Sequence, residues 1–465
     1  MFHVTDVEVR VVPVATRIPF RYGITELTSA PHAVVSLQLT SGAGTSRGMS
    51  AENLPPKWFT KDPDSSLDDD LADMVRVVLS AARAAEGLAG ASPFDWWMRL
   101  QALQEEWGRA AGLPPLLVGL GTSLMERAMI DAWCRLTAIP FGTALRADAL
   151  GVDLGALHPE LAGTAPSRYL PARGRRSLAI RHTIGLADPV PLAPRVLDDG
   201  LPETAEDAVG AYGLDHLKIK TQGDVARDVI RLAEILEMIE ATRRPFAVTV
   251  DGNESFYSSE DFVLWWQQLA AAPGIGSFLA EALIAIEQPF HRSMALDPTL
   301  ADMFTSHPEL PMLIIDESDG EPDSIRRAMD LGYAGGTYKG CKGVFRGVAN
   351  ACLVNARFGD RTTILTAEDL TTLPPLALLQ DFAVVSALGL THIERNGHYF
   401  FGTVAQIAPR VDELLLESHP DLFERSSDGR AQLAILHGEV AIGTVVDAPF
   451  GCAPEFDLAG LPELV

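Results

Sequence analysis

The sequence has few cysteines, and their spacing argues against a small zinc-binding protein and against a small disulfide-bonded protein. No two of them form a CxxC pair that would indicate a zinc site, and they are too scattered for a disulfide framework. We expect reduced thiols and a cytoplasmic location. The four cysteines are Cys134, Cys341, Cys352 and Cys452.

Long apolar runs are also missing. No uncharged stretch reaches the roughly 18 residues that a membrane-spanning helix needs, and the opening MFHVTDVEVR has an acid within its first six residues. We therefore expect neither a membrane span nor a secretory signal peptide.

Basic residues are scarce compared with acidic ones. The chain has 37 Lys and Arg against 62 Asp and Glu, a net charge of −25. Nucleic acid is an improbable partner, because phosphate binding needs clustered basic side chains. The Gly-Leu-Gly at residues 119–121 follows no strand of a βαβ unit, so a dinucleotide cofactor is not expected. Small molecules and metal ions fit this composition better.

What the chain does have is a series of apolar runs that end in an acid. The run AVTVDGNESF ends its β-branched residues at Asp251, LIAIEQP ends at Glu287, and MLIIDES ends at Asp316. A continuous β-branched run closed by a turn is typical of a strand buried on both faces. Each acid therefore lies at the carboxyl end of a predicted strand.

Lysines end two further runs of the same kind. LKIK carries Lys218 and Lys220, and GTYKGCKG carries Lys339 and Lys342. The five runs recur at intervals close to the roughly 30 residues that one strand-plus-helix unit of an eight-fold barrel occupies. Three carboxylates and the flanking lysines would then meet at one mouth of the barrel.

The rest of the region from Arg181 onward repeats the order strand, turn, helix. It contains eight predicted strands with seven helical segments between them, including a helix for which Asp224 is the predicted N-cap, and the last strands TTILTAED and LTHIE. Strands that alternate with helices predict a parallel sheet, and eight of them suggest closure into a barrel. With 465 residues and 47% hydrophobic content, the chain can also bury a second domain.

The region before the barrel has a different pattern. Residues 1–52 alternate apolar and polar, with a Gly-rich turn at 41–44 and a loop at 17–30, which predicts antiparallel hairpins. A polar linker at 57–70 precedes about 70 residues of helical pattern. The clearest helix is GTSLMERAMIDAWCRLTAIP, for which Ser123 and Glu126 suggest a capping box and Pro140 an end. A Pro- and Arg-rich stretch at 157–175 is the best candidate for a domain boundary.

Three carboxylates on rigid strand ends suit a hard divalent cation such as Mg²⁺, with Mn²⁺ as an alternative. One acid at a strand end is more often a turn or cap residue, but three acids at one barrel mouth repel each other unless a cation lies among them. We therefore take Asp251, Glu287 and Asp316 as metal ligands. Asn253 and Glu317 follow closely and are candidates to support the ligands or contact substrate, although either could be a solvated loop residue.

The lysines supply the second half of the predicted chemistry. The second and sixth strands lie on opposite sides of a barrel, so a lysine from each would flank a substrate at the metal. Such a pair can remove a proton next to a carboxylate and return one, while the metal stabilises the enediolate. The alternative for Lys218 and Lys220 is a pair of surface lysines beside an edge strand.

These motifs together resemble the enolase superfamily, and within it the mandelate racemase/muconate-lactonizing enzyme-like branch of muconate-lactonizing enzymes, dipeptide epimerases and o-succinylbenzoate synthases. The resemblance spans nearly the whole chain. It rests on the KxK pair Lys218-Ile219-Lys220 and on the acids in VDGNE, IEQP and DES. The helix GTSLMERAMIDAWCRL and the segment APFGCAPEFD are similar to the capping domain's helix and the returning C-terminal segment.

The resemblance implies an α/β fold, a modified TIM barrel of the (β/α)7β type under an α+β capping domain. Residues 1–165 would form the cap, 176–405 the barrel, and 406–465 a segment that returns to the cap. Lys220 and a lysine of the sixth strand would be the acid/base pair, with Lys218 beside them. We take Lys339 because it follows the strand directly, with Lys342 as the alternative, since this segment lacks the family's second glycine.

Substrate contacts are expected from the ends of the seventh and eighth strands and from the cap. Glu368 and Asp369 end the seventh strand, and a polar cluster ends the eighth. Each residue is individually more often structural than functional. The candidates for substrate binding are Asn253, Glu317, Lys342, Asp369, His392, Glu394, Tyr22 and Trp58.

The leading hypothesis is a Mg²⁺-dependent enzyme that abstracts a proton α to a carboxylate of a small acid, giving racemisation, epimerisation, β-elimination or cycloisomerisation. We expect a homo-oligomer with no nucleic-acid or membrane partner. A sugar-acid dehydratase would need His392 or His398 as acid or base, because the seventh strand has no histidine. A barrel that keeps the metal site without catalysis is the third possibility.

Overall fold

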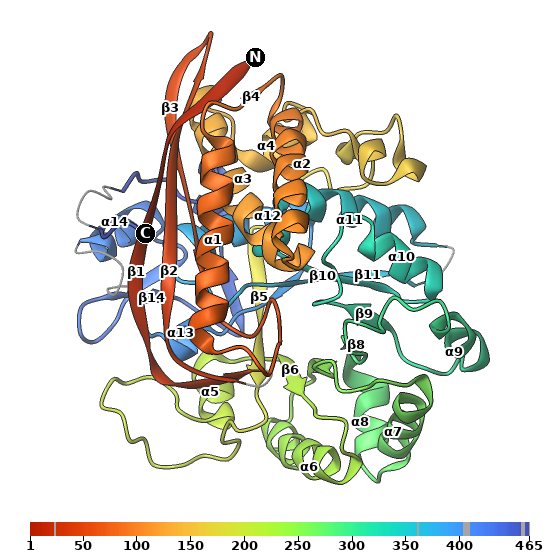
Figure 1. Ribbon diagram of the computed structural model, residues 1–465. Coiled ribbons are helices and arrows are strands. Elements are labelled where there is room, and N and C mark those ends of the chain that lie inside the picture. Colours follow the sequence, from red (N-terminus) through yellow and green to blue (C-terminus); the bar gives the residue numbers. More distant parts are fainter. Residues whose placement is uncertain (23–24, 360–361, 403–409, 457–460, 465) are drawn as a thin grey trace.

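The computed structural model describes residues 1–22, 25–359, 362–402, 410–456 and 461–464. Its N-terminal part is an antiparallel sheet packed on three helices (Figure 1). The strands are β1 (Phe2–Tyr22), β2 (Thr25–Ser41), β3 (Gly44–Asn53) and β4 (Ala89–Gly90), in the order β3-β2-β1-β4. The helices are α1 (Leu67–Ala85), α2 (Pro93–Ala111) and α3 (Pro115–Thr137), followed by the short α4 (Phe141–Arg146).

Two local predictions for this part were wrong. Residues 17–22 and 25–30 extend β1 and β2 instead of forming a loop, and a register shift between Ala15 and Phe20 keeps the long strands paired. Helix α3 begins at Pro115 rather than at Ser123. Ser123 lies inside the helix, where its hydroxyl donates to the carbonyl of Leu120. The start was missed because α3 is buried on nearly all sides, so its first turns have no amphipathic pattern.

The second part is a closed barrel of eight parallel strands, as predicted. Its strands are β5 (Ser177–Ile184), β6 (His216–Lys220), β7 (Ala247–Asp251), β8 (Leu283–Glu287), β9 (Leu313–Ile315), β10 (Gly335–Lys339), β11 (Ile364–Glu368) and β12 (His392–Glu394). Neighbours in the chain are neighbours in the sheet, and β12 closes the barrel on β5. Burial on both faces explains why these strands are continuous apolar runs.

Every connection between barrel strands carries at least one helix. In chain order these are α5 (Ala205–Tyr212), α6 (Val225–Thr242), α7 (Ser259–Ala271), α8 (Ile275–Ala282), α9 (Leu300–Ser306), α10 (Ser324–Leu331), α11 (Val344–Arg357) and α12 (Leu376–Leu388). Asp224 caps α6 as predicted, since its side chain accepts from the amide of Arg227. The unit between β7 and β8 is long because it holds both α7 and α8.

The C-terminal part contacts both the barrel and the N-terminal sheet. It contains α13 (Gly397–Phe400), α14 (Val411–Ser418), β13 (Phe423–Arg425), β14 (Ala431–Leu433), β15 (Glu439–Ala441) and α15 (Gly443–Asp447). Strand β15 pairs antiparallel with β5. Further on, the amide of Val11 donates to the carbonyl of Pro462, and Arg10 pairs with Glu463 at 3.2 Å. Among the described residues, no helix is both long enough and apolar enough to cross a membrane.

Helix α3 also joins the N-terminal part to the barrel. The buried carboxylate of Glu126 accepts hydrogen bonds from the amides of Val344 and Phe345, at 3.0 and 2.7 Å. These are the first two residues of α11, where an acid satisfies free amides and complements the helix dipole. Helix α11 starts one residue after Gly343, directly beyond the lysines of the 339–342 segment. Glu126 therefore anchors the segment that follows β10.

The burial of Glu126 predicts a pH dependence of stability. Burial raises the pKa of Glu126 from 4.5 to about 7 despite its two amide partners. The folded protein then holds this proton more tightly than the unfolded chain, so stability falls as the pH rises through this window. Glu126→Gln has no carboxyl to ionise at this position. Its free energy of unfolding should therefore rise relative to that of the wild type by up to about 3 kcal/mol between pH 5 and 8.

Thermal melts over this pH range measure the difference between the two proteins. Glu106→Gln, which removes an exposed carboxylate from α2, is the control for the loss of one charge. A constant difference between Glu126→Gln and wild type at every pH would contradict the prediction.

Candidate active site

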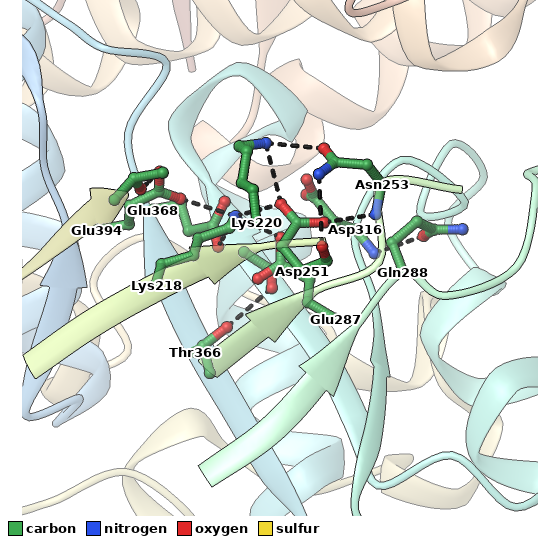
Figure 2. Close-up of polar contacts among 12 residues, drawn as sticks. Lys218, Lys220, Asp251, Asn253, Glu287, Gln288, Asp316, Thr366, Glu368 and Glu394 are labelled. Atoms are coloured by element: carbon green, nitrogen blue, oxygen red, sulfur yellow. Dashed lines mark hydrogen bonds and ion pairs between the residues drawn. The ribbon is translucent and has the colours of Figure 1, made fainter. Parts of the chain in front are cut away.

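The ionisable residues at the strand ends lie in one layer of the barrel. Parallel register places their backbones side by side, and Asp316 follows the last residue of β9 directly. We call this group the charged ring, and its acids are shown with Lys218 and Lys220 in Figure 2. Its members are Lys218, Lys220, Asp251, Glu287, Asp316, Lys339, Glu368 and Glu394. In-register neighbours in it are Lys220 and Asp251, Asp251 and Glu287, Lys339 and Glu368, and Glu368 and Glu394.

Lys218 lies at the centre of the charged ring. Its ammonium contacts four carboxylates: Glu287 at 2.7 Å, Glu368 and Glu394 at 2.9 Å, and Asp251 at 3.1 Å. Burial alone would lower the pKa of Lys218, but these four charges raise it well above its usual value. Lys218 is therefore a fixed positive charge that holds the acids together, and it is not an edge-strand surface residue.

Lys220 and Asp251 form a second contact of the ring. The ammonium of Lys220 donates to Asp251 at 3.1 Å and to the side-chain oxygen of Asn253 at 2.7 Å. The other oxygen of Asp251 accepts from the backbone amide of Asn253 at 2.8 Å. Burial opposes ionisation of Asp251, but Lys218 and Lys220 lower its pKa well below the usual value.

Lys339 lies across the barrel from Lys220. Strands β6 and β10 are four strands apart in either direction around the closed sheet. The ammonium of Lys339 donates to Asp316 at 2.7 Å and pairs with Glu368 at 3.0 Å. It also lies 4.4 Å from the ring centre of Trp58 in the N-terminal part, within cation–π range. These acids raise the pKa of Lys339 well above its usual value, although burial lowers it.

Lys342 has a different environment from Lys339. Its ammonium donates to the carboxylate and the backbone carbonyl of Asp316, at 2.8 and 2.7 Å, and to the carbonyl of Thr337 at 3.1 Å. All three partners belong to the barrel wall, and Lys342 does not line the pocket. Its geometry favours positioning of Asp316 over contact with a substrate, so Lys339 is the better placed of the two lysines for proton transfer.

The acids of the ring can hold a cation. One oxygen each from Glu287, Asp316 and Glu368 lie within 4.8 Å of one another, and all three residues are buried. The Oε2 atom of Glu287 is buried without a hydrogen-bond partner in the described part of the chain, which is costly unless something compensates it. Burial and the charge of Glu368 raise the pKa of Glu287 well above its usual value, and a cation among the acids would favour the charged form. These observations fit a divalent metal with oxygen ligands.

A pocket opens above the ring. Its floor is the charged ring, and its other wall comes from β1, β2 and the segment after β3 in the N-terminal part. The wall brings apolar side chains together with three polar ones, Asn53, Lys57 and Lys61. The lining residues from the N-terminal part are Phe20, Leu27, Asn53, Pro55, Lys57, Trp58 and Lys61.

The segment after β3, residues 54–66, is tied to the barrel by two basic residues. Arg292 pairs with Glu254 and donates to the carbonyls of Trp58 and Phe59, at 3.1 and 2.7 Å. Lys61 donates to the carbonyl of Asn253 at 2.6 Å and pairs with Glu254 at 3.1 Å. We call this segment the cap loop. Its position over the pocket depends on Glu254, three residues after Asp251.

The remaining predicted substrate residues fall into two groups. Asn253, Glu317, Asp369, Glu394 and Trp58 line the pocket. His392 does not, because it lies at the first residue of β12, below the mouth, where it contacts the guanidinium of Arg181 at 2.6 Å. His398 is buried outside the pocket as well, and no histidine of the described chain lines it. The side chain of Tyr22 lies outside the described part of the chain.

Sequence reasoning missed two residues that shape the ring. Arg181, fully buried in β5, donates to Glu368 at 3.0 Å. Gln288 accepts from the amides of Asp316 and Ser318, at 2.8 and 3.2 Å, and so fixes the turn after β9. A basic residue inside a predicted barrel strand was the available signal for Arg181. The signal for Gln288 was its place next to Glu287.

No protein-family model matches the sequence, and no curated protein is significantly similar to it. Solved structures do match. A mandelate racemase/muconate lactonizing protein from Herpetosiphon aurantiacus has a TM-score of 0.55 at 17% identity, covering 94% of this chain and 98% of that one. The N-succinyl Arg/Lys racemase from Bacillus cereus ATCC 14579 has a TM-score of 0.58 at 15% identity, covering 96% and 97%. A dipeptide epimerase from Enterococcus faecalis V583, complexed with Mg and L-Leu-L-Tyr, has a TM-score of 0.57 at 16% identity, covering 94% and 99%.

The fold is therefore that of a closed (β/α)7β barrel with an antiparallel capping sheet. More narrowly, it is the fold of the mandelate racemase/muconate lactonizing protein, the racemase and the dipeptide epimerase described above, as the resemblance in the sequence predicted.

The contacts of the cap loop predict how its mobility will change on mutation. Arg292→Ala removes two hydrogen bonds to the loop backbone and the partner of Glu254, so amides in residues 54–66 should exchange with solvent about tenfold faster or more, corresponding to roughly one such bond in free energy. Hydrogen exchange followed by mass spectrometry checks this.

Arg327→Ala is the matched control, since it removes an exposed arginine whose partners, Glu321 and Asp323, lie on the barrel surface. Unchanged exchange in the cap loop of Arg292→Ala would show that other contacts hold the loop in place.

Proposed function

We propose that this protein is an enzyme of the enolase superfamily that removes the proton α to the carboxylate of a small carboxylic acid. The reaction class is racemisation or epimerisation, β-elimination or cycloisomerisation. The observation that carries the proposal is the pair of ammonium groups of Lys220 and Lys339, which face a cluster of buried carboxylates from opposite strands of the barrel. The solved structure with bound Mg and a dipeptide supports the choice of cofactor and substrate class.

The cofactor of this proposal is Mg²⁺, with Mn²⁺ as an alternative ion, held by Asp251, Glu287 and Asp316. When bound, the metal supplies positive charge that stabilises the enediolate form of the substrate carboxylate. Lys218 keeps the acids gathered, and Lys342 and Gln288 orient Asp316. The chain thus supplies a rigid set of oxygen ligands, each already fixed by a hydrogen bond.

The two lysines carry the proton steps. Lys220, as the free amine, takes the α-proton at its Nζ atom from one face of the substrate. For racemisation or epimerisation, the other returns a proton to the same carbon from the opposite face. For β-elimination, the electron pair left on the α-carbon expels a group from the β-carbon instead. The cap loop and the apolar wall of the pocket exclude water from the carbanionic state.

A histidine-dependent sugar-acid dehydratase is less well supported. Neither His392 nor His398 lines the pocket, and burial lowers the pKa of both well below the usual value. If His392→Asn lost turnover while Lys220→Ala kept it, this alternative would replace ours.

Exchange of the substrate α-proton with solvent tests the proposal. Incubation with Mg²⁺ in D₂O and a library of α-substituted carboxylic acids should show loss of the α-proton signal by NMR for at least one acid. Lys220→Ala or Lys339→Ala should reduce the rate about 10²- to 10⁴-fold, the usual contribution of a general acid or base. Removal of the metal with EDTA should abolish exchange.

Lys220→Arg is the control that separates charge from proton transfer, because arginine keeps the positive charge but stays protonated. A fall in exchange in both Lys220 variants supports the role as base. Wild-type protein that binds Mg²⁺ yet exchanges no α-proton across the library would instead be a barrel without this chemistry.

A further inference from the structure

The carboxylate of Glu368 has two different sides. Its Oε1 atom accepts from Lys218 at 2.9 Å and from Arg181 at 3.0 Å, two cations that are themselves buried. Among the described residues, its Oε2 atom makes no hydrogen bond of regular geometry and pairs with the ammonium of Lys339 at 3.0 Å. Two buried cations thus hold one oxygen of Glu368, and the second oxygen contacts the terminal ammonium of Lys339.

The other acids whose oxygens could bind a cation lie close to Glu368. Glu287 is fully buried, and its Oε2 atom has no hydrogen-bond partner among the described residues. Glu287, Asp316 and Glu368 each bring one oxygen to within 4.8 Å of the others. Three carboxylates this close, one with an unpartnered oxygen, form a set that a hard divalent cation satisfies.

Asp251 differs from these three acids because both of its carboxylate oxygens already have partners. One of its oxygens accepts from Lys218 and Lys220, both at 3.1 Å, and the other accepts from the amide of Asn253 at 2.8 Å. It does not belong to the close group. The described geometry therefore gives Glu368 a closer relation to Glu287 and Asp316 than Asp251 has.

We propose that Glu368, at the end of β11, is itself a metal ligand of this protein, joining Glu287 and Asp316 at the divalent cation. This rests on the proposed function, since both require a cation at the barrel mouth. It goes beyond that proposal because it adds a ligand from the seventh strand to a site drawn from the third, fourth and fifth. Arg181 and Lys218 are the positioning residues of this ligand.

The competing role for Glu368 is charge balance alone. Its carboxylate neutralises Arg181, Lys218 and Lys339, and that role needs no metal. Glu394 provides a matched comparison, because it is also a buried acid, pairs in register with Glu368 and contacts Lys218 at 2.9 Å. It does not belong to the close group. Glu368→Gln and Glu394→Gln therefore both remove a negative charge near Lys218, but only Glu368→Gln would remove a metal ligand.

Metal affinity measured without substrate tests the proposal. Binding of Mn²⁺ to the full-length protein is followed by the loss of the free-ion EPR signal, and binding of Mg²⁺ by calorimetry. We expect Glu368→Gln to weaken binding by more than the roughly 10- to 100-fold that loss of a group behind a metal ligand costs, and Glu394→Gln to change it by less than about threefold. Equal affinities of Glu368→Gln and wild type, or equal losses in both variants, would overturn the proposal.

Two further measurements keep the test decisive. If Glu368→Gln does not fold, a crystal structure of the wild type with Mn²⁺ replaces it, since anomalous scattering shows directly whether Glu368 coordinates the ion. Coordination supports the proposal and its absence overturns it. Wild-type protein that binds neither ion refutes the proposed function itself, whereas metal binding that ignores Glu368 refutes only the added ligand.

Discussion

The structure depends on one buried ammonium group. Lys218 brings a single positive charge into contact with four carboxylates from four strands, all in the interior of the barrel. Each of these charges would cost several kcal/mol to bury alone, and the cost is offset only when geometry and hydrogen bonds are good for every partner. Removing Lys218 would leave four acids with too little positive charge between them. The ion pairs between Lys218 and the four carboxylates therefore fix the arrangement of side chains at the barrel mouth.

Other cations also neutralise the buried acids, and they lie at different depths in the barrel. Arg181 lies below the mouth and contacts Glu368, while Lys339 and Lys342 contact Asp316 from the side. The contact of Arg181 with Glu368 needs a closed sheet, because β5 lies next to β12 and near β11 only when the first and last strands pair. Barrel closure and charge balance are thus one constraint. It explains why ionisable residues gather at strand ends that are far apart in the sequence.

Much of this could be predicted from the sequence, because each barrel strand is a local signal. An apolar run that ends in an acid or a lysine before a turn identifies both the strand and its carboxyl end, as at Asp251 and Lys339. Contacts between strands are not local. The engagement of Arg181 with Glu368, and the turning of Lys342 toward Asp316 and away from the pocket, depend on register and strand tilt. Helix α3 was misplaced for a similar reason, since a helix buried all round carries no periodic pattern.

The cap loop is coupled to the acids through a short piece of backbone. Asn253 and Glu254 both adopt left-handed conformations, with φ of 47° and 61°, directly after Asp251 and Gly252. Such conformations are unfavourable for residues other than glycine unless the surroundings hold them. Here the amide of Asn253 binds Asp251, and Glu254 binds the arginine and lysine that hold the cap loop. A shift of this turn would therefore move an acid of the ring and the lid of the pocket together. The cap loop and the acids of the ring are therefore coupled through one turn of backbone.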